Sequence, residues 1–127
     1  MSNLLERKNV LKVKNFLKNF DEKIELIILD ETARTAKDAA KSLKREVGAI
    51  VKSLLFKNTE FNEFYLCLVS GDKYMSLQKL SKIIGNNVVK ANADDCKQVT
   101  GFSIGGVPPV AYLHTPSRIF IDENLNR

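Results

Sequence analysis

The sequence predicts an α/β fold of the α+β type, in which helices pack around a mixed sheet. Two observations predict this fold. Apolar segments of strand length alternate along the chain with segments whose apolar residues fall at helical spacing. The 127 residues are enough for one domain with one hydrophobic core, and they contain no apolar run long enough to span a membrane.

The first third of the chain is predicted to hold two helices with a strand between them. Residues 4–20 carry apolar side chains near helical spacing, with lysines between them. This helix is either a solvated amphipathic helix or a basic helix that rests on a phosphate backbone. Residues 24–29 form an apolar run of strand length. Thr32 or Thr35 can cap the second helix, which is expected to run to about Arg45.

Two longer strands are predicted at residues 50–56 and 61–70. The second is apolar on both faces, so we expect it in the middle of the sheet. The first contains Lys52, and burying an unpaired ammonium group costs free energy. Lys52 must therefore reach water, a carboxylate or an anionic ligand, and the residues alone leave open whether its role is structural or ligand-binding.

Capping residues and glycines mark the ends of the elements that follow. In order, the expected elements are a helix capped by Ser76 and ended by Gly85, a strand at Val88-Val89, a helix at residues 92–99, a strand at residues 118–122 and a polar tail at residues 123–127.

A segment rich in glycine and proline occupies residues 100–109. Its paired glycines, Gly105 and Gly106, can adopt positive φ or let the backbone approach a ligand closely. Free backbone N–H groups in such a turn can bind an oxyanion or a phosphate, and a purely structural tight turn is an equal alternative. The segment lacks the residues of a P-loop or a dinucleotide-binding fingerprint.

Conventional catalytic groups are scarce in this sequence. The sequence contains no nucleophile-elbow motif whose nucleophile the only histidine, His114, could activate. His114 is therefore either a structural residue or part of a pocket lining. Cys67 and Cys96 are expected to be buried thiols, and with one histidine they are too few for a closed zinc site. We predict no metal and no cofactor. Any catalysis would depend on positioning and backbone electrostatics.

Charge and the N-terminal residues bear on partners and location. The 20 Lys and Arg exceed the 15 Asp and Glu, and the resulting net charge of +5 weakly favours a polyanionic partner. The first six residues lack the basic start, apolar stretch and cleavage site of a secretory signal. We therefore expect a cytoplasmic protein with no membrane partner.

Several blocks of sequence, taken in order, resemble the YbaK/EbsC family, the aminoacyl-tRNA editing domain that is also inserted in bacterial prolyl-tRNA synthetases. The similarity runs from about Thr32 to Leu125. It implies a curved mixed sheet with peripheral helices, and residues 1–127 as a single editing domain that is short at its C-terminus for the family. The matching blocks are residues 32–40, 48–56, 68–72, 100–110 and 121–123.

The resemblance also implies the chemistry. The family's lysine falls on Lys52, and its Gly-x-x-x-Pro motif falls on Gly105 to Pro109. Lys52, Gly105 and Gly106 are therefore the expected catalytic residues: Lys52 would hold the phosphate of the terminal adenosine or orient the charged end, and the glycine N–H groups would bind the ester carbonyl. The residues expected to line the substrate pocket are Thr35, Ser53, Phe102, Pro109 and His114.

The expected function is that of a trans-acting deacylase, which hydrolyses the ester between a mischarged small amino acid and tRNA. A non-catalytic tRNA-binding or synthetase-associated module is the alternative, and a hydrolase of another small acyl ester is a third. The expected partners are aminoacylated tRNA and an aminoacyl-tRNA synthetase. The sequence leaves the amino acid, the tRNA species and the oligomeric state open.

Overall fold

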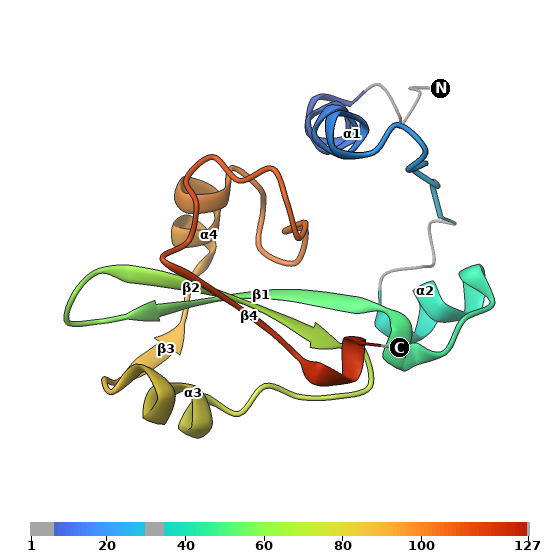
Figure 1. Cartoon of the computed structure of the whole chain (residues 1–127). Coiled ribbons are helices and arrows are strands. Elements are labelled where there is room, and N and C mark those ends of the chain that lie inside the picture. The colour runs from blue at the N-terminus through green and yellow to red at the C-terminus, as the bar shows by residue number, and fades with distance from the viewer. Residues whose placement is uncertain (1–6, 30–34, 127) are drawn as a thin grey trace.

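The computed structural model of the chain describes residues 7–29 and 35–126 (Figure 1). Its helices are α1 (Lys8–Phe20), α2 (Ala36–Leu43), α3 (Leu77–Ile84) and α4 (Ala93–Thr100), with short 3-10 helices η2 (Val47–Ala49) and η3 (Glu123–Leu125). Its strands are β1 (Val51–Asn58), β2 (Glu63–Ser70), β3 (Val88–Lys90) and β4 (Arg118–Ile121).

The four strands form one mixed sheet in the order β3-β1-β2-β4. The β1–β2 hairpin is antiparallel and pairs Val51 with Ser70 at one end and Asn58 with Glu63 at the other. β3 runs antiparallel to β1, whereas β4 runs parallel to β2. β2 therefore has a neighbour on each side, which confirms both the mixed sheet and the central place predicted for this strand.

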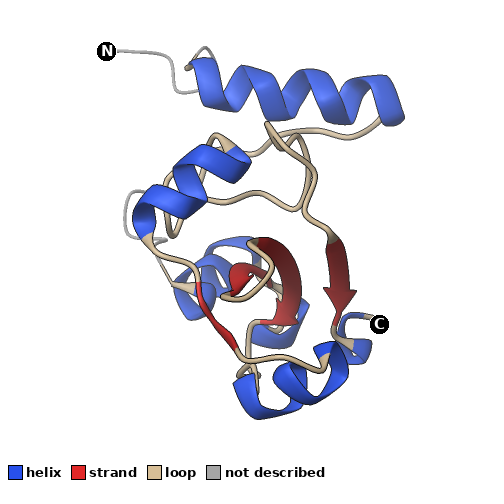
Figure 2. Cartoon of the chain, turned by 90° about the vertical axis from the view of Figure 1, so that its left-hand side faces the viewer, coloured by secondary structure: helices blue, strands red, loops and turns tan. Residues whose placement is uncertain are grey.

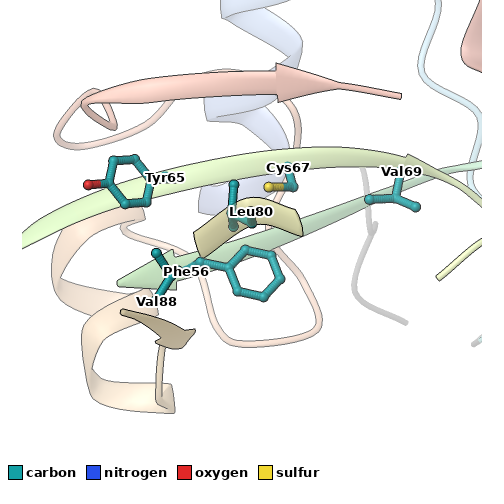
Figure 3. Packing of buried hydrophobic residues seen from close by; sticks show 6 residues of the cluster. All are labelled: Phe56, Tyr65, Cys67, Val69, Leu80 and Val88. Carbon is teal, nitrogen blue, oxygen red and sulfur yellow. The ribbon is translucent and has the colours of Figure 1, made fainter. Parts of the chain in front are cut away.

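Helices cover the two faces of the sheet, with α3 on one side and α4 on the other (Figure 1). On the α3 side, the fully buried Leu80 packs against Phe56, Tyr65 and Cys67 of the hairpin (Figure 3). The α4 side has its own apolar cluster, made by Leu55, Leu66, Ala91 and Cys96. Side chains alternate between the faces of a strand, so each residue of β1 belongs to one of these two environments.

The ends of α3 and α4 follow the local signals of the sequence. The Ser76 hydroxyl accepts a hydrogen bond from the Lys79 backbone N–H, and Gly85 ends α3 in the left-handed conformation. Asn92 and Asp95 form a reciprocal capping box at the start of α4, which Gly101 ends at φ of 83°. Both predicted helices are confirmed.

Helix α1 is the outermost element on the α4 side of the molecule (Figures 1 and 2). None of its residues is buried. Val10 and Val13 line a small groove together with residues of the extended segment that follows the helix and of the glycine-rich loop. No helix among the described residues is both long enough and apolar enough to cross a bilayer.

The strand predicted at residues 24–29 is wrong. This segment has no strand pairing in the structure, and Ile27 and Ile28 are 67% and 43% exposed. A strand needs a partner for its backbone N–H and C=O groups, and the described sheet ends at β3 and β4 without reaching this segment. Leu26, Ile27 and Ile28 of this segment instead line a small groove together with residues of α1.

Candidate functional site

The glycine-rich loop is built around a tight turn at residues 103–106. The Gly106 N–H donates to the Ser103 carbonyl over 2.8 Å, and Gly105 has φ of 82°. A positive φ at the third residue is typical of a type II turn, which favours glycine there. A Cβ at Gly105 would meet nothing within 4 Å, so it is the backbone conformation and not crowding that favours glycine.

The turn gives different hydrogen-bonding states to the two backbone N–H groups that were expected to bind a ligand, those of Gly105 and Gly106. The Gly106 N–H already donates a hydrogen bond inside the turn, so in this conformation it is engaged by the protein. The Gly105 N–H has no hydrogen-bond partner among the described residues. Gly105 is thus the remaining predicted donor.

The loop is anchored to the end of α4. The Thr100 hydroxyl accepts a hydrogen bond from the Phe102 N–H over 3.0 Å. The backbone N–H groups of Leu113 and His114 donate to the carbonyls of Thr100 and Val99, at 3.0 and 2.8 Å. These bonds close the loop at both ends and leave its tip, with Gly105, exposed to solvent.

A small groove lies between the loop and α1, and we call it the Gly-loop groove. Its volume is about 250 Å³, and its lining is almost wholly apolar. Phe102, which is buried, and Gly106 line it from the loop side. The other lining residues are Asn9, Val10 and Val13 of α1, Leu26, Ile27 and Ile28 of the following segment, and Pro108.

Pro109 lines a second groove farther along α1, together with Lys12, Phe16 and Tyr112. The Lys12 ammonium lies 5.2 Å from the centroid of the Phe102 ring, so this cation lies beside the loop. From sequence, Lys12 was expected only on the basic face of a helix. Lys12 and Phe16 are four residues apart and so share one face of the helix, and this spacing was the available signal that Lys12 faces the loop with the apolar residues.

Lys52 lies on the other face of the sheet. Side-chain alternation along β1 places it with Leu54 and Phe56 on the α3 side, whereas Ser53 shares the α4 side with Leu55. The Lys52 ammonium donates a hydrogen bond to the Lys73 carbonyl, and it lies 4.8 Å from the centroid of the Tyr74 ring. In this conformation the structure does not bring Lys52 and Gly105 together.

Beside Lys52 lies a groove of about 380 Å³, which we call the Tyr74 groove. Its floor is apolar and includes Leu80 and Phe120, and its rim carries Lys73 and Lys79. Tyr74 is 95% exposed. Tyr74 was not among the residues predicted from sequence, although an aromatic side chain next to a lysine in a polar connection was a usable signal.

The other predicted pocket residues lie outside the lining of the Gly-loop groove. The Thr35 hydroxyl accepts from the Asp38 N–H over 3.1 Å and so caps α2, as predicted. Thr32, the alternative cap, lies outside the described residues. The His114 side chain is exposed. Of the predicted residues, the structure thus gathers Phe102 and Gly106 in one groove and Pro109 in the next.

The two cysteine thiols are buried and are therefore poor candidates for a nucleophile. Cys67 and Cys96 are 1% and 3% exposed, which confirms the expectation of buried thiols. Desolvation raises the pKa of Cys67 to about 11, so the reactive thiolate is scarce at neutral pH. Burial likewise raises the pKa of Tyr112 to about 12, and its hydroxyl has no partner among the described residues.

No group of three or more histidine, cysteine or acidic side chains within the described ranges has the arrangement of a metal site. The available chemistry is therefore a backbone donor at an exposed turn, a small apolar groove, and two grooves lined by lysine, one with Lys12 and one with Lys73 and Lys79. Such a set can orient an acyl group and bind a polyanion.

Comparison with known proteins identifies what this fold is similar to. The aminoacyl-tRNA editing domain matches residues 30–127. A crystal structure of a protein proposed to be a trans-editing enzyme for prolyl-tRNA synthetase superposes with a TM-score of 0.85 at 37% identity, over 94% of this chain and 74% of the other.

Two sequence relatives agree with this result. The uncharacterised protein YwhH of Bacillus subtilis is 26% identical over 98 residues, which are 77% of this chain and 61% of the relative. The proline–tRNA ligase of Lactobacillus acidophilus is 35% identical over 77 residues, which are 60% of this chain and 13% of the ligase. The chain thus spans less than two thirds of the length of either relative.

Proposed function

The chain belongs to the aminoacyl-tRNA editing domain family, and from this premise we propose that it is a trans-acting deacylase of mischarged tRNA. Its substrate is the ester that joins a small amino acid to the 3′ end of tRNA. It acts in the cytoplasm as a single editing domain, beside an aminoacyl-tRNA synthetase. The structural match to a protein proposed to edit in trans for prolyl-tRNA synthetase supports this assignment.

The observation that carries the proposal is the exposed turn at Gly105 next to a small apolar groove. We place the ester carbonyl at the Gly105 N–H, where a preorganised donor stabilises the negative charge of the tetrahedral intermediate. A groove of about 250 Å³ has room for a small amino acid side chain. Discrimination by size supplies only about 1–3 kcal/mol per methylene, which is the reason for editing by a second site.

The reaction needs only water as co-reactant. Water attacks the ester carbonyl, the bond to the ribose oxygen breaks, and that oxygen takes up a proton. The products are the free amino acid and uncharged tRNA. An ester of this kind is already activated, so positioning and one backbone donor suffice without a conventional general base.

Lys52 serves the tRNA and not the ester in this scheme. Its ammonium lies on the opposite face from the glycine-rich loop, where it can neutralise a phosphate of the bound strand. The same separation favours the second candidate function, a tRNA-binding module without turnover. Hydrolysis of charged tRNA separates the two.

The test is deacylation of tRNAs charged with Ala, Cys, Ser, Thr or Pro. We expect turnover of one or two of them by the wild type. Gly105→Ala forces an L-residue to φ of 82° and displaces the donor, so turnover should fall by about 10²–10³-fold, the loss seen when an oxyanion donor is removed. Lys52→Ala should raise KM more than it lowers kcat.

Gly85→Ala is the matched control for Gly105→Ala. Gly85 has φ of 85° and, like Gly105, nothing within 4 Å of an added Cβ, but it ends α3. The two variants should lose similar stability, and only Gly105→Ala should lose turnover. Binding of tRNA with no hydrolysis of any of the five substrates above background would replace the deacylase with the binding module.

A further inference from the structure

Tyr74 has an environment that folding alone does not explain. Its side chain is 95% exposed in the connection between β2 and α3, so it contributes almost no buried apolar surface. The Lys52 ammonium lies 4.8 Å from the ring centroid and so covers one face of the ring. The opposite face is open to solvent, and it is presented beside the Tyr74 groove.

Positive charge surrounds this open ring. Lys52 is held in place by its hydrogen bond to the Lys73 carbonyl. The side chains of Lys73 and Lys79 are exposed, and both line the Tyr74 groove. Three lysines thus lie on this side of the sheet: Lys52 against the Tyr74 ring, and Lys73 and Lys79 in the lining of the groove that Tyr74 also lines.

Two carboxylates lie close to these lysines, and protein donors already engage both. The Asp122 oxygens accept hydrogen bonds from the backbone N–H groups of Ser70 and Asn124, at 3.0 and 2.9 Å. The Asp72 carboxylate accepts from the Ser70 hydroxyl over 3.0 Å. Both acids keep their negative charge, and Asp122 lines the Tyr74 groove together with Lys73. The patch therefore sets three lysines against two carboxylates whose oxygens already accept hydrogen bonds from the protein.

We infer that this patch binds the single-stranded segment at the 3′ end of an RNA, with a base upstream of the terminal nucleotide stacked on the open face of Tyr74. Exposed aromatic rings flanked by cations are the usual means of holding single-stranded nucleic acid: the ring stacks on a base and the cations neutralise phosphates. Lys73 and Lys79 lie on the groove rim, where the backbone of such a strand would pass. The inference rests on the proposed function only in taking tRNA as the source of that end.

The chemistry favours RNA over an acidic peptide. An acidic peptide would satisfy the lysines, but it brings a flat ring to the open face of Tyr74 only where it carries an aromatic residue. Every nucleotide brings both a phosphate and a base. Because the glycine-rich loop lies on the other face of the sheet, Tyr74 should act in binding and not at the ester. Tyr74→Ala should therefore raise KM for charged tRNA and leave kcat nearly unchanged.

The direct test measures binding by fluorescence anisotropy with a 5′-labelled single-stranded RNA that ends in CCA. Tyr74→Ala should weaken binding by about 5- to 150-fold, which corresponds to the loss of one base–aromatic stack. Tyr74→Phe keeps the ring and should bind within about twofold of the wild type. Phe61→Ala is the matched control, because Phe61 is 63% exposed in the turn between β1 and β2.

Two further measurements separate stacking from charge. Tyr74→Ala should not change the affinity for a blunt RNA duplex, which offers no free base at the patch. Lys79→Ala should reduce the slope of log affinity against log salt by about 0.7, the value for one phosphate contact on a single strand. Circular dichroism is expected to be the same for all variants, because the substituted side chains are exposed.

Several results would overturn the inference. They are a wild type that does not bind the RNA, a Tyr74→Ala variant that binds as the wild type does, and equal losses for Phe61→Ala. If the wild type deacylates tRNA while RNA binding is independent of Tyr74, this inference fails and the proposed function stands. If RNA binding depends on Tyr74 but the wild type does not deacylate tRNA, the inference stands and the proposed function fails.

Discussion

Ala111 provides a quantitative test of the backbone geometry, because it adopts the left-handed conformation with φ of 66°. For an L-residue this conformation costs roughly 1–2 kcal/mol. Glycine avoids that cost, but it gives the unfolded chain more freedom, which offsets roughly 0.5–1 kcal/mol. Ala111→Gly should therefore raise the free energy of unfolding by roughly 0.5–1 kcal/mol.

Urea unfolding measures this change. With a slope of about 1–3 kcal/mol per molar, the midpoint should rise by about 0.2–1 M. The control is Ala93→Gly, at the exposed first residue of α4, where glycine should instead lower stability by up to about 1 kcal/mol. A midpoint for Ala111→Gly that is unchanged, or that falls as in Ala93→Gly, would refute the claim that this residue is strained.

Two further predictions concern Gly71 and Asp122. A Cβ at Gly71 would lie 2.3 Å from the Val47 carbonyl oxygen, so Gly71→Ala should destabilise the fold by at least about 2 kcal/mol in a urea titration. Gly106→Ala is the control: the closest atom to its added Cβ lies at 3.5 Å, so its stability should be nearly unchanged. The Asn124 N–H, and next the Ser70 N–H, lower the pKa of Asp122, so the unfolded chain binds this proton more readily and the bonds stabilise the fold at neutral pH. Asp122→Asn should be less stable than the wild type at pH 7, and the difference should shrink as the pH falls through the lowered pKa; a difference independent of pH would contradict this origin.

Elements whose ends are marked by nearby residues were predictable from the chain alone. Ser76 and Gly85 flank α3, as predicted, and α4 lies between Asn92 and Gly101, close to the helix predicted at residues 92–99. Capping depends on bonds between residues three or four positions apart, so neighbours in sequence carry the information. The two-sided apolar pattern of β2 likewise predicted its central place.

Only the tertiary structure could decide features that depend on residues far apart. The run at residues 24–29 has the composition of a strand, but whether it pairs depends on a free sheet edge within reach. Here it stays outside the described sheet and lines a groove together with α1. The turn at Gly105 was foreseen as one of two alternatives, whereas the capture of the Gly106 N–H by Ser103 is a matter of three-dimensional geometry.

In the candidate site, too, the sequence indicated the residues and the tertiary structure determined their arrangement. Motif spacing singled out Lys52 and Gly105, but spacing does not record which face of the sheet each residue occupies. That depends on strand register and on the side to which α3 and α4 cross, and a shift of one residue in β1 would exchange Lys52 with Ser53. Residue types therefore indicated the chemistry, and the pairing of distant strands determined which groups can act together.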